Sequence, residues 1–310
     1  MSISNKDPKV LVIIGPTASG KTSLGVKLAA RFDGEIVSAD SRQVFRGMDI
    51  GTGKDLAEYV LPGQTIPCHL IDVCAPMEDY NLARYQVDAS KAINEIIARE
   101  KLPLLVGGSG LYLQAIVDGY VLSPTAPNPE TRASLEKMSV TELYQKLQSL
   151  KPDFAARLNN SDRNNPRRLV RYLEITLNQQ AAAPKIEKPA YDFLILSLNP
   201  DDEMMRARIE KRLKERLQKE GLVAEVERLL DSGVTSARLN SFGLEYRYIS
   251  WYLQEKIDYE TMVEKLSTAI YRFAKRQKTW FKRWAKQGRE LIEVSTEEEA
   301  AAIVQKWLKA

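Results

Sequence analysis

The sequence predicts an α/β fold in which a parallel sheet is flanked by helices and an all-helical insertion interrupts the chain. Short apolar runs alternate with helical patterns over the first 120 residues, which is typical of a parallel sheet covered on both faces. Proline-rich stretches then bracket a segment that has helical periodicity and no strand signal. Another apolar run follows this segment, so the sheet is expected to resume after the insertion.

The first expected strand, Val10–Ile14, leads through GPTASGKT directly into a helical pattern. This setting distinguishes a phosphate-binding loop from a chance match and makes the fold P-loop NTPase-like. Consecutive backbone N–H groups and the positive end of the helix form an anion cradle. Lys21 is expected to reach the outer phosphates, and the Thr22 hydroxyl to ligate Mg²⁺. The candidate phosphate-binding residues are Gly15, Pro16, Thr17, Ala18, Ser19, Gly20, Lys21 and Thr22.

The second expected strand, Glu35–Ala39, is followed by DSRQ. Asp40 would therefore lie at the carboxyl end of this strand, where open α/β sheets bind their ligands. Its carboxylate can hold Mg²⁺ through water, as in an NTPase, or act as a general base toward a substrate. A structural alternative is that Asp40 caps a helix or turn. Gln43 can present a bidentate amide to an adenine edge.

The third expected strand, His69–Val73, contains the only histidine of the chain, which we interpret as a hydrogen-bonded structural residue. A single histidine excludes an HExxH zinc site. The fourth expected strand, Leu102–Val106, ends in GGSG instead of a carboxylate, which counts against ordinary ATP hydrolysis. Glycines at that place allow another backbone or a ligand to approach closely.

The expected domain boundaries follow the proline-rich stretches 122–129 and 179–189. We predict a first part of the core over residues 1–122, a helical insertion over 123–190, and a continuation of the core over 191–310. The continuation begins with a fifth strand, Tyr191–Leu198. Two long helical patterns, residues 201–233 and 258–288, then close the chain.

Charge and composition indicate the kind of partner. The net charge is only +4, but residues 271–289 hold eight Lys/Arg and no Asp/Glu, and residues 162–171 hold four arginines. Basic stretches of this kind beside a phosphate site favour a polyanionic partner. No apolar run approaches the roughly 18 residues that a membrane span needs, so we expect a cytoplasmic protein with no membrane partner. Cys68 and Cys74 are too few for a disulfide framework or a four-cysteine metal site, and we expect half-buried thiols.

Six motifs occur together in this order: GPTASGKT, ADSRQVFRGMDIGTGK, HLIDV, LLVGGSGLYL, NNPRRLVRYLE and RFAKRQKTWFKR. With their spacings they resemble the bacterial tRNA dimethylallyltransferases, also called tRNA isopentenyltransferases, over nearly the whole chain. The resemblance implies that dimethylallyl diphosphate and tRNA are the substrates and Mg²⁺ the cofactor. The dimethylallyl group would pass to N6 of adenosine 37, just 3′ of the anticodon, with release of diphosphate.

The resemblance also implies residue roles. Asp40 matches the general base, Thr17 a residue facing the bridging oxygen of the donor, and Lys21 a cation that stabilises the leaving diphosphate. Arg212 resembles an arginine of the donor site, with a surface ion pair as the alternative. The insertion would bind tRNA. The implied tRNA-binding residues are Asp40, Ser41, Arg42, Gln43, Ser109, Arg132, Arg167, Arg168, Arg171 and Arg276.

This chain departs from the family pattern in several places. Asp202 stands where an arginine is frequent, FGLEYRYISWYL differs from the usual Gly-Tyr-Arg/Lys pattern, and one extra residue lies between Arg212 and Gly221. Other functions compatible with the motifs are an adenylate isopentenyltransferase, a small-metabolite P-loop kinase and a non-catalytic RNA-binding protein. The insertion and both basic clusters favour a large RNA acceptor. Nothing indicates an obligate dimer, so we expect a monomer.

Overall fold

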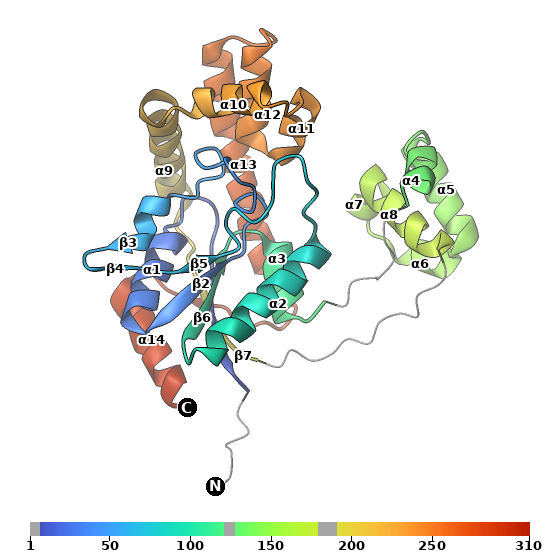
Figure 1. Cartoon of the computed structure of the whole chain (residues 1–310). Coiled ribbons are helices and arrows are strands. Elements are labelled where there is room, and N and C mark those ends of the chain that lie inside the picture. The colour runs from blue at the N-terminus through green and yellow to red at the C-terminus, as the bar shows by residue number, and fades with distance from the viewer. Residues whose placement is uncertain (1–6, 121–127, 179–190) are drawn as a thin grey trace. The chain divides into compact units, whose positions relative to one another are not determined.

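The computed structural model describes residues 7–120, 128–178 and 191–310. The chain forms two compact units, one of residues 1–119 and 188–310 and the other of residues 120–187 (Figure 1). The proline-rich stretches that were predicted to bound the insertion lie outside the described residues, apart from residues 128 and 129. No helix in the described part of the chain is long and apolar enough to cross a membrane.

The larger unit is built on a six-stranded sheet in the order β5-β2-β6-β1-β7-β8, in which every neighbouring pair is parallel. This confirms the predicted α/β class with a parallel sheet. Four of the five predicted strands occur within one or two residues of their predicted bounds. The strands are β1 (Lys9–Ile14), β2 (Gly34–Ser38), β5 (Cys68–His69), β6 (Leu102–Gly107), β7 (Asp192–Ser197) and β8 (Ile292–Glu293).

The predicted strand over His69–Val73 is wrong, because only Cys68–His69 belong to the sheet. Leu70 and Asp72 have φ angles of 64° and 59°, so the chain leaves the extended conformation there. Two further strands, β3 (Val60–Leu61) and β4 (Gln64–Thr65), form a separate antiparallel pair that was not predicted. Strand β8 and the C-terminal helix α14 (Glu297–Lys309) were also missed.

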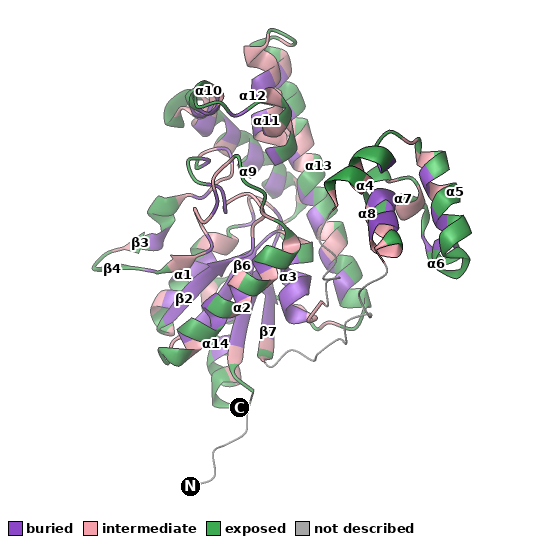
Figure 2. Ribbon diagram, turned by 45° about the vertical axis from the view of Figure 1, so that its right-hand side comes forward, coloured by how far each residue is buried: buried purple, intermediate pink, exposed green. Residues whose placement is uncertain are grey.

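Helices cover both faces of the sheet, as Figure 2 shows by the buried strands between them. Along β1, Val10, Val12 and Ile14 pack toward α2 (Leu82–Ala98) and α3 (Gly110–Val117). Leu11 and Ile13, which alternate with them, pack toward α1 (Lys21–Arg31) and α14. Each such side chain contributes about 1.5–3 kcal/mol when it is fully buried. The sheet core therefore holds the loops at the strand ends in fixed positions.

A cluster of helices, drawn above the sheet in Figure 1, completes the larger unit. The predicted single helix over residues 201–233 is wrong, because a π-turn and Gly221, with φ of 84°, divide it. The pattern over residues 258–288 is confirmed as one helix that packs on both the sheet and this cluster. The elements of the cluster are α9 (Asp202–Glu215), η2 (Arg216–Glu220), α10 (Leu222–Asp231), α11 (Ser236–Phe242), α12 (Leu244–Leu253) and α13 (Tyr259–Lys286). A further short helix, η1 (Leu56–Tyr59), packs beside α1.

The smaller unit is helical in its described residues, and its core is formed mainly by leucines, with Ala155 and Val170. Several of its helices begin at a side-chain cap, including a capping box between Ser139 and Glu142. Asn165 caps the helix that carries the NNPRR arginines. The helices are α4 (Pro129–Leu135), α5 (Val140–Leu150), α6 (Pro152–Arg157), α7 (Asn160–Arg163) and α8 (Pro166–Leu177).

Candidate active site

A pocket of about 290 Å³ lies at the carboxyl ends of β1, β2 and β6, under the helices that complete the larger unit. Nine of the predicted site residues line this pocket, although they come from four separate segments of the chain. They are Thr17, Lys21, Thr22, Asp40, Ser41, Arg42, Gln43, Ser109 and Arg212. Gly15, Pro16, Ala18, Ser19 and Gly20 form the rest of the phosphate-binding loop.

A side chain of helix α13 holds the phosphate-binding loop in place. The Thr17 backbone N–H donates a 2.8 Å hydrogen bond to Oε1 of Gln277, whose Nε2 donates to the carbonyl of Gly108 at 2.9 Å. Gln277 is buried and thus joins the loop after β1 to the glycines after β6. Gln277 belongs to the motif RFAKRQKTWFKR, but no role was predicted for it.

Lys21 lies at the start of α1, where its ammonium donates to the Pro16 carbonyl at 3.3 Å. Burial, opposed by the negative charge of Asp40 and assisted by the nearby Arg212, lowers the pKa of Lys21 to about 8. The charge of this lysine is therefore sensitive to pH near neutrality. An anion bound in the loop would favour the protonated form.

Asp40 follows β2 and accepts a 2.8 Å hydrogen bond on Oδ1 from the Arg42 backbone N–H. This is the turn-capping contact that was considered as an alternative, and it uses one oxygen of a carboxylate that also lines the pocket. The Ser41 N–H donates to Oγ of Ser109 at 3.1 Å, which joins DSRQ to GGSG. A Cβ on Gly107 would lie 2.2 Å from the Ala39 carbonyl oxygen. The predicted close backbone approach at these glycines is confirmed.

Gln43 does not present a free amide to the pocket. Its Oε1 accepts from the Ser38 hydroxyl and its Nε2 donates to the Gly53 carbonyl, both at 2.9 Å. The predicted bidentate contact with an adenine edge would have to replace at least one of these bonds. In this structure, Gln43 instead fixes the loop that contains Gly53 to the end of β2.

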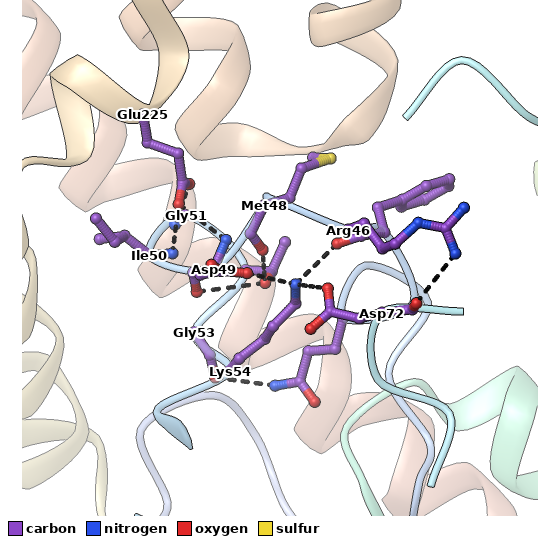
Figure 3. Close-up of polar contacts among 12 residues, drawn as sticks. Arg46, Met48, Asp49, Ile50, Gly51, Gly53, Lys54, Asp72 and Glu225 are labelled. Carbon is purple, nitrogen blue, oxygen red and sulfur yellow. Dashed lines mark hydrogen bonds and ion pairs between the residues drawn. The ribbon is translucent and has the colours of Figure 1, made fainter. Parts of the chain in front are cut away.

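The loop formed by residues 48–54 is a wall of the pocket that sequence reasoning did not assign. Glu225 of α10 is buried and accepts backbone N–H groups of Asp49, Ile50 and Gly51 at 2.8, 2.8 and 2.9 Å (Figure 3). Its carboxylate also accepts the Tyr246 hydroxyl at 2.8 Å. No local signal marks Glu225, since it lies 174 positions from Gly51 in the chain.

Lys54 also holds the loop of residues 48–54 in place. Its side chain is fully buried, and its ammonium donates to the Phe45 carbonyl at 2.8 Å and to Asp49 at 2.6 Å and pairs with Asp72, as Figure 3 shows. A buried ammonium requires such partners because burial of an unpaired charge is costly. Together, Glu225 and Lys54 hold Gly51, Thr52 and Gly53 against the pocket.

A family model described as IPP transferase matches residues 43–284, and one described as isopentenyl transferase matches residues 8–66. The chain belongs to the IPP transferase family. It is 45% identical over 285 residues to tRNA dimethylallyltransferase 1 of Syntrophus aciditrophicus, covering 91% of this chain and 92% of the relative. It is also 45% identical over 280 residues to tRNA dimethylallyltransferase 1 of Porphyromonas gingivalis, covering 90% and 91%.

Solved structures agree with this assignment. The full-length tRNA isopentenylpyrophosphate transferase of Bacillus halodurans superposes with a TM-score of 0.68 at 32% identity, covering 97% of this chain and 95% of that one. A eukaryotic dimethylallyltransferase, solved acting on tRNA, gives 0.80 at 25% identity, covering 97% and 80%.

Two departures of this IPP transferase from its family pattern have structural counterparts. Asp202 forms ion pairs with Lys275 and Lys278 of α13 and does not line the pocket. The region with one extra residue contains the π-turn η2, which begins at Arg216. Arg216 and Glu245 both line the pocket, and neither had been assigned a role.

Four arginines predicted to bind tRNA lie in the smaller unit of this IPP transferase. Arg132 donates to the buried Glu174 at 2.9 and 2.7 Å, and Arg171 approaches the same carboxylate at 3.5 Å. Arg168 is exposed and pairs with Asp162, and Arg167 is exposed. Arg132 is therefore tied to the core of its unit, whereas Arg167 and Arg168 have guanidinium groups at the surface.

The remaining predicted residues lie outside the pocket. Arg276 is exposed on α13, where it stacks on Phe273 and lines a separate groove. His69 forms a 2.7 Å hydrogen bond with Glu35, which confirms it as a structural histidine. Both cysteines are free thiols, one of them buried. Within the described ranges, no group of three or more His, Cys, Asp or Glu side chains could hold a metal ion.

Proposed function

We propose that this IPP transferase moves a dimethylallyl group from dimethylallyl diphosphate to N6 of adenosine 37 in tRNA, releasing diphosphate. The observation that carries the proposal is that one pocket contains Thr17 and Lys21 of an anion-binding loop together with the carboxylate Asp40. The relatives named tRNA dimethylallyltransferase support this choice of donor and acceptor.

The reaction requires one bond to form while another breaks. The N6 lone pair attacks the allylic carbon, the bond from that carbon to the bridging oxygen breaks, and its electron pair leaves with diphosphate. The proton lost from N6 passes to Asp40, a transfer that contributes typically about 10²- to 10⁴-fold. Backbone N–H groups of the loop and the Lys21 ammonium stabilise the charge that grows on the leaving diphosphate.

The residues around Lys21 fit a magnesium ion that arrives with the donor. Mg²⁺ is usually held by one or two protein oxygens together with substrate phosphates and water, so a complete protein cage is not required. The Thr22 hydroxyl lines the pocket next to Lys21 and is the proposed ligand from this chain. The ion would supply additional positive charge to the leaving group.

An RNA acceptor agrees better with the charge distribution than a free nucleotide does. The exposed face of α13 carries Arg272, Arg276 and Lys282, and the smaller unit exposes Arg167 and Arg168. Such residues neutralise phosphates and orient the nucleic acid without reading its sequence. The target adenosine must leave its stack to enter a pocket. We further propose that the enzyme acts as a monomer in the cytoplasm, where tRNA is found.

The experiment that tests this proposal offers two acceptors to the same enzyme. The protein is incubated with Mg²⁺ and dimethylallyl diphosphate labelled in the allyl group, and with either tRNA or AMP. We expect label in tRNA alone. Label in AMP would identify an adenylate isopentenyltransferase, and hydrolysis of ATP with label in neither acceptor would identify another P-loop activity.

A further inference from the structure

Arg216 lines the pocket and is the first residue of an unusual turn of the backbone. The π-turn Arg216–Glu220 joins α9 to α10 in the segment that carries one extra residue relative to the family pattern. Single π-turns within helices are rare and frequently occur at functional sites. Arg212 lies four positions earlier, so the two side chains project from the same face of the helix.

Both arginines share one carboxylate. Arg216 Nη2 lies 3.2 Å from Asp55 Oδ1, and Arg212 pairs with the other oxygen of Asp55. Asp55 has a φ of 46°, a left-handed conformation that costs energy in a residue other than glycine. The structure thus holds the Asp55 carboxylate between two guanidinium groups, so that one negative charge faces two positive ones.

Arg216 also keeps hydrogen-bonding capacity that no residue in the described part of the chain uses. Its residue is 8% exposed, and its Nε atom has no hydrogen-bond partner within the described residues. A buried donor without a partner costs about 1–3 kcal/mol, so native proteins rarely keep one without a ligand or water. The Nε and Nη atoms on one edge of a guanidinium can donate two parallel hydrogen bonds to two oxygens of a phosphate.

The neighbouring loop is shaped around the two guanidinium groups. A Cβ on Gly53 would lie 2.4 Å from Nη2 of Arg216 and 3.0 Å from Nη2 of Arg212. Gly53 therefore allows both arginines to lie against the loop of residues 48–54. A smaller hollow, lined by Arg212, Arg216 and Thr17, extends from them to the phosphate-binding loop.

The charges around this place favour an anion. More cationic than acidic side chains line the pocket, and Asp55 adds one carboxylate beside it. The pocket-lining charged groups are Lys21, Arg42, Arg212 and Arg216 against Asp40 and Glu245. Burial raises the pKa of Glu245, and burial together with Arg216 lowers the pKa of Arg212 to about 10. A bound anion would relieve the repulsion between the arginines.

We propose that Arg216 is a second donor-binding arginine, which contacts the diphosphate of the allylic donor together with Arg212. This inference rests on the proposed function, because it assigns the diphosphate to the phosphate-binding loop that Arg216 faces. Asp55 would orient the two guanidinium groups before the donor arrives. Arginine suits this role better than lysine, because its planar fork binds two phosphate oxygens at once.

The test compares Arg216→Met, which keeps an unbranched apolar side chain and removes the guanidinium, with the exposed Arg228→Met on α10 as the matched control. Binding of inorganic diphosphate with Mg²⁺ is measured by calorimetry, and KM is measured separately for dimethylallyl diphosphate and tRNA. We expect Arg216→Met to weaken diphosphate binding and raise the donor KM by about 10- to 100-fold, with the tRNA KM unchanged. Arg228→Met should match the wild type.

Arg216→Lys keeps the protein assayable if the methionine variant does not fold. We expect it to recover part of the charge effect while diphosphate binding remains weaker than in the wild type. Unchanged diphosphate binding, or a rise in the tRNA KM alone, overturns the proposal and assigns Arg216 to the RNA or to the fold. Weakened diphosphate binding in an enzyme that labels neither tRNA nor AMP would support the anion site and reject the proposed function.

Discussion

Gln277 accepts a hydrogen bond from the backbone N–H of Thr17 at 2.8 Å and so connects the basic helix α13 to the phosphate-binding loop. The other end of the same amide donates to the Gly108 carbonyl at 2.9 Å. One side chain therefore sets the distance between the loops that follow β1 and β6. The helix that we propose to face RNA also positions the loop that we propose to hold the donor.

Replacing Gln277 with leucine removes both bonds and leaves the partly buried N–H of Thr17 and the buried carbonyl of Gly108 unpaired. Each loss costs roughly 1–3 kcal/mol of unfolding free energy. We expect a lower urea midpoint and about tenfold weaker binding of inorganic diphosphate, because the loop is no longer held. Gln287→Leu, at the exposed end of the same helix, is the control and should change neither value. Diphosphate binding equal to the wild type would show that the loop keeps its shape without Gln277.

The lowered pKa of Lys21 predicts a pH dependence of donor binding. The ammonium of the free protein is charged below about pH 8 and loses its proton as the pH rises through that value. Bound diphosphate stabilises the ammonium, so binding above this pH must take up a proton. Affinity should then fall by up to about tenfold per pH unit. Calorimetry at pH 8.5 in buffers of different ionisation enthalpy should detect the uptake, and Lys21→Met should abolish it.

Glu225 offers a test of the wall formed by residues 48–54. Glu225→Gln replaces a carboxylate that accepts three backbone N–H groups and the Tyr246 hydroxyl. Hydrogen bonds to charged groups contribute about 1.5–3 kcal/mol each, so we expect a loss of several kcal/mol in unfolding free energy. The donor KM should rise as well. Glu227→Gln, exposed on the same helix, should have the stability of the wild type; an equal loss in both variants would contradict the anchoring role.

The parts of the site that the sequence predicts are those encoded by neighbouring residues. GPTASGKT and DSRQ each follow a buried strand, and parallel strands bring their carboxyl ends to one edge of a sheet. Asp40 and Lys21 could therefore be placed in one site before the structure was known. The strand over His69–Val73 was predicted wrongly because an apolar pattern does not reveal a positive φ at Leu70 and Asp72.

The parts that sequence reasoning missed depend on contacts between distant segments. Glu225 reaches a loop about 175 positions away, and Gln277 reaches the phosphate-binding loop 260 positions away. No periodicity or spacing specifies such pairs. Arg216 lies one helical turn after Arg212, but nothing in the local sequence indicates that this face of α9 lines a pocket. Gln43 was predicted to face a base, but Ser38 and Gly53 occupy its amide.

The variant Asp40→Asn distinguishes a role of Asp40 in proton transfer from a role in substrate binding. The asparagine keeps an Oδ1 atom that can accept the Arg42 N–H, so the turn after β2 should retain its shape. The amide cannot take the proton from N6. We therefore expect single-turnover transfer to fall by about 10²- to 10⁴-fold while tRNA and diphosphate affinities change little. Loss of tRNA binding with an unchanged chemical rate would contradict the role of general base.

The two kinds of arginine in the smaller unit should respond differently to substitution. Arg168 is exposed, so Arg168→Ala should weaken tRNA binding, reduce the slope of log affinity against log salt by about 1, and leave diphosphate binding unchanged.

Arg132 instead pairs with Glu174, whose side chain is fully buried. Arg132→Ala leaves that charge without its bidentate partner, which costs about 3–5 kcal/mol when a buried pair is broken. We expect Arg132→Ala to unfold at a lower urea concentration than the wild type. The double variant Arg132→Ala/Glu174→Leu should be more stable than Arg132→Ala. A salt slope that falls in the stable double variant as it does in Arg168→Ala would instead place Arg132 on the tRNA.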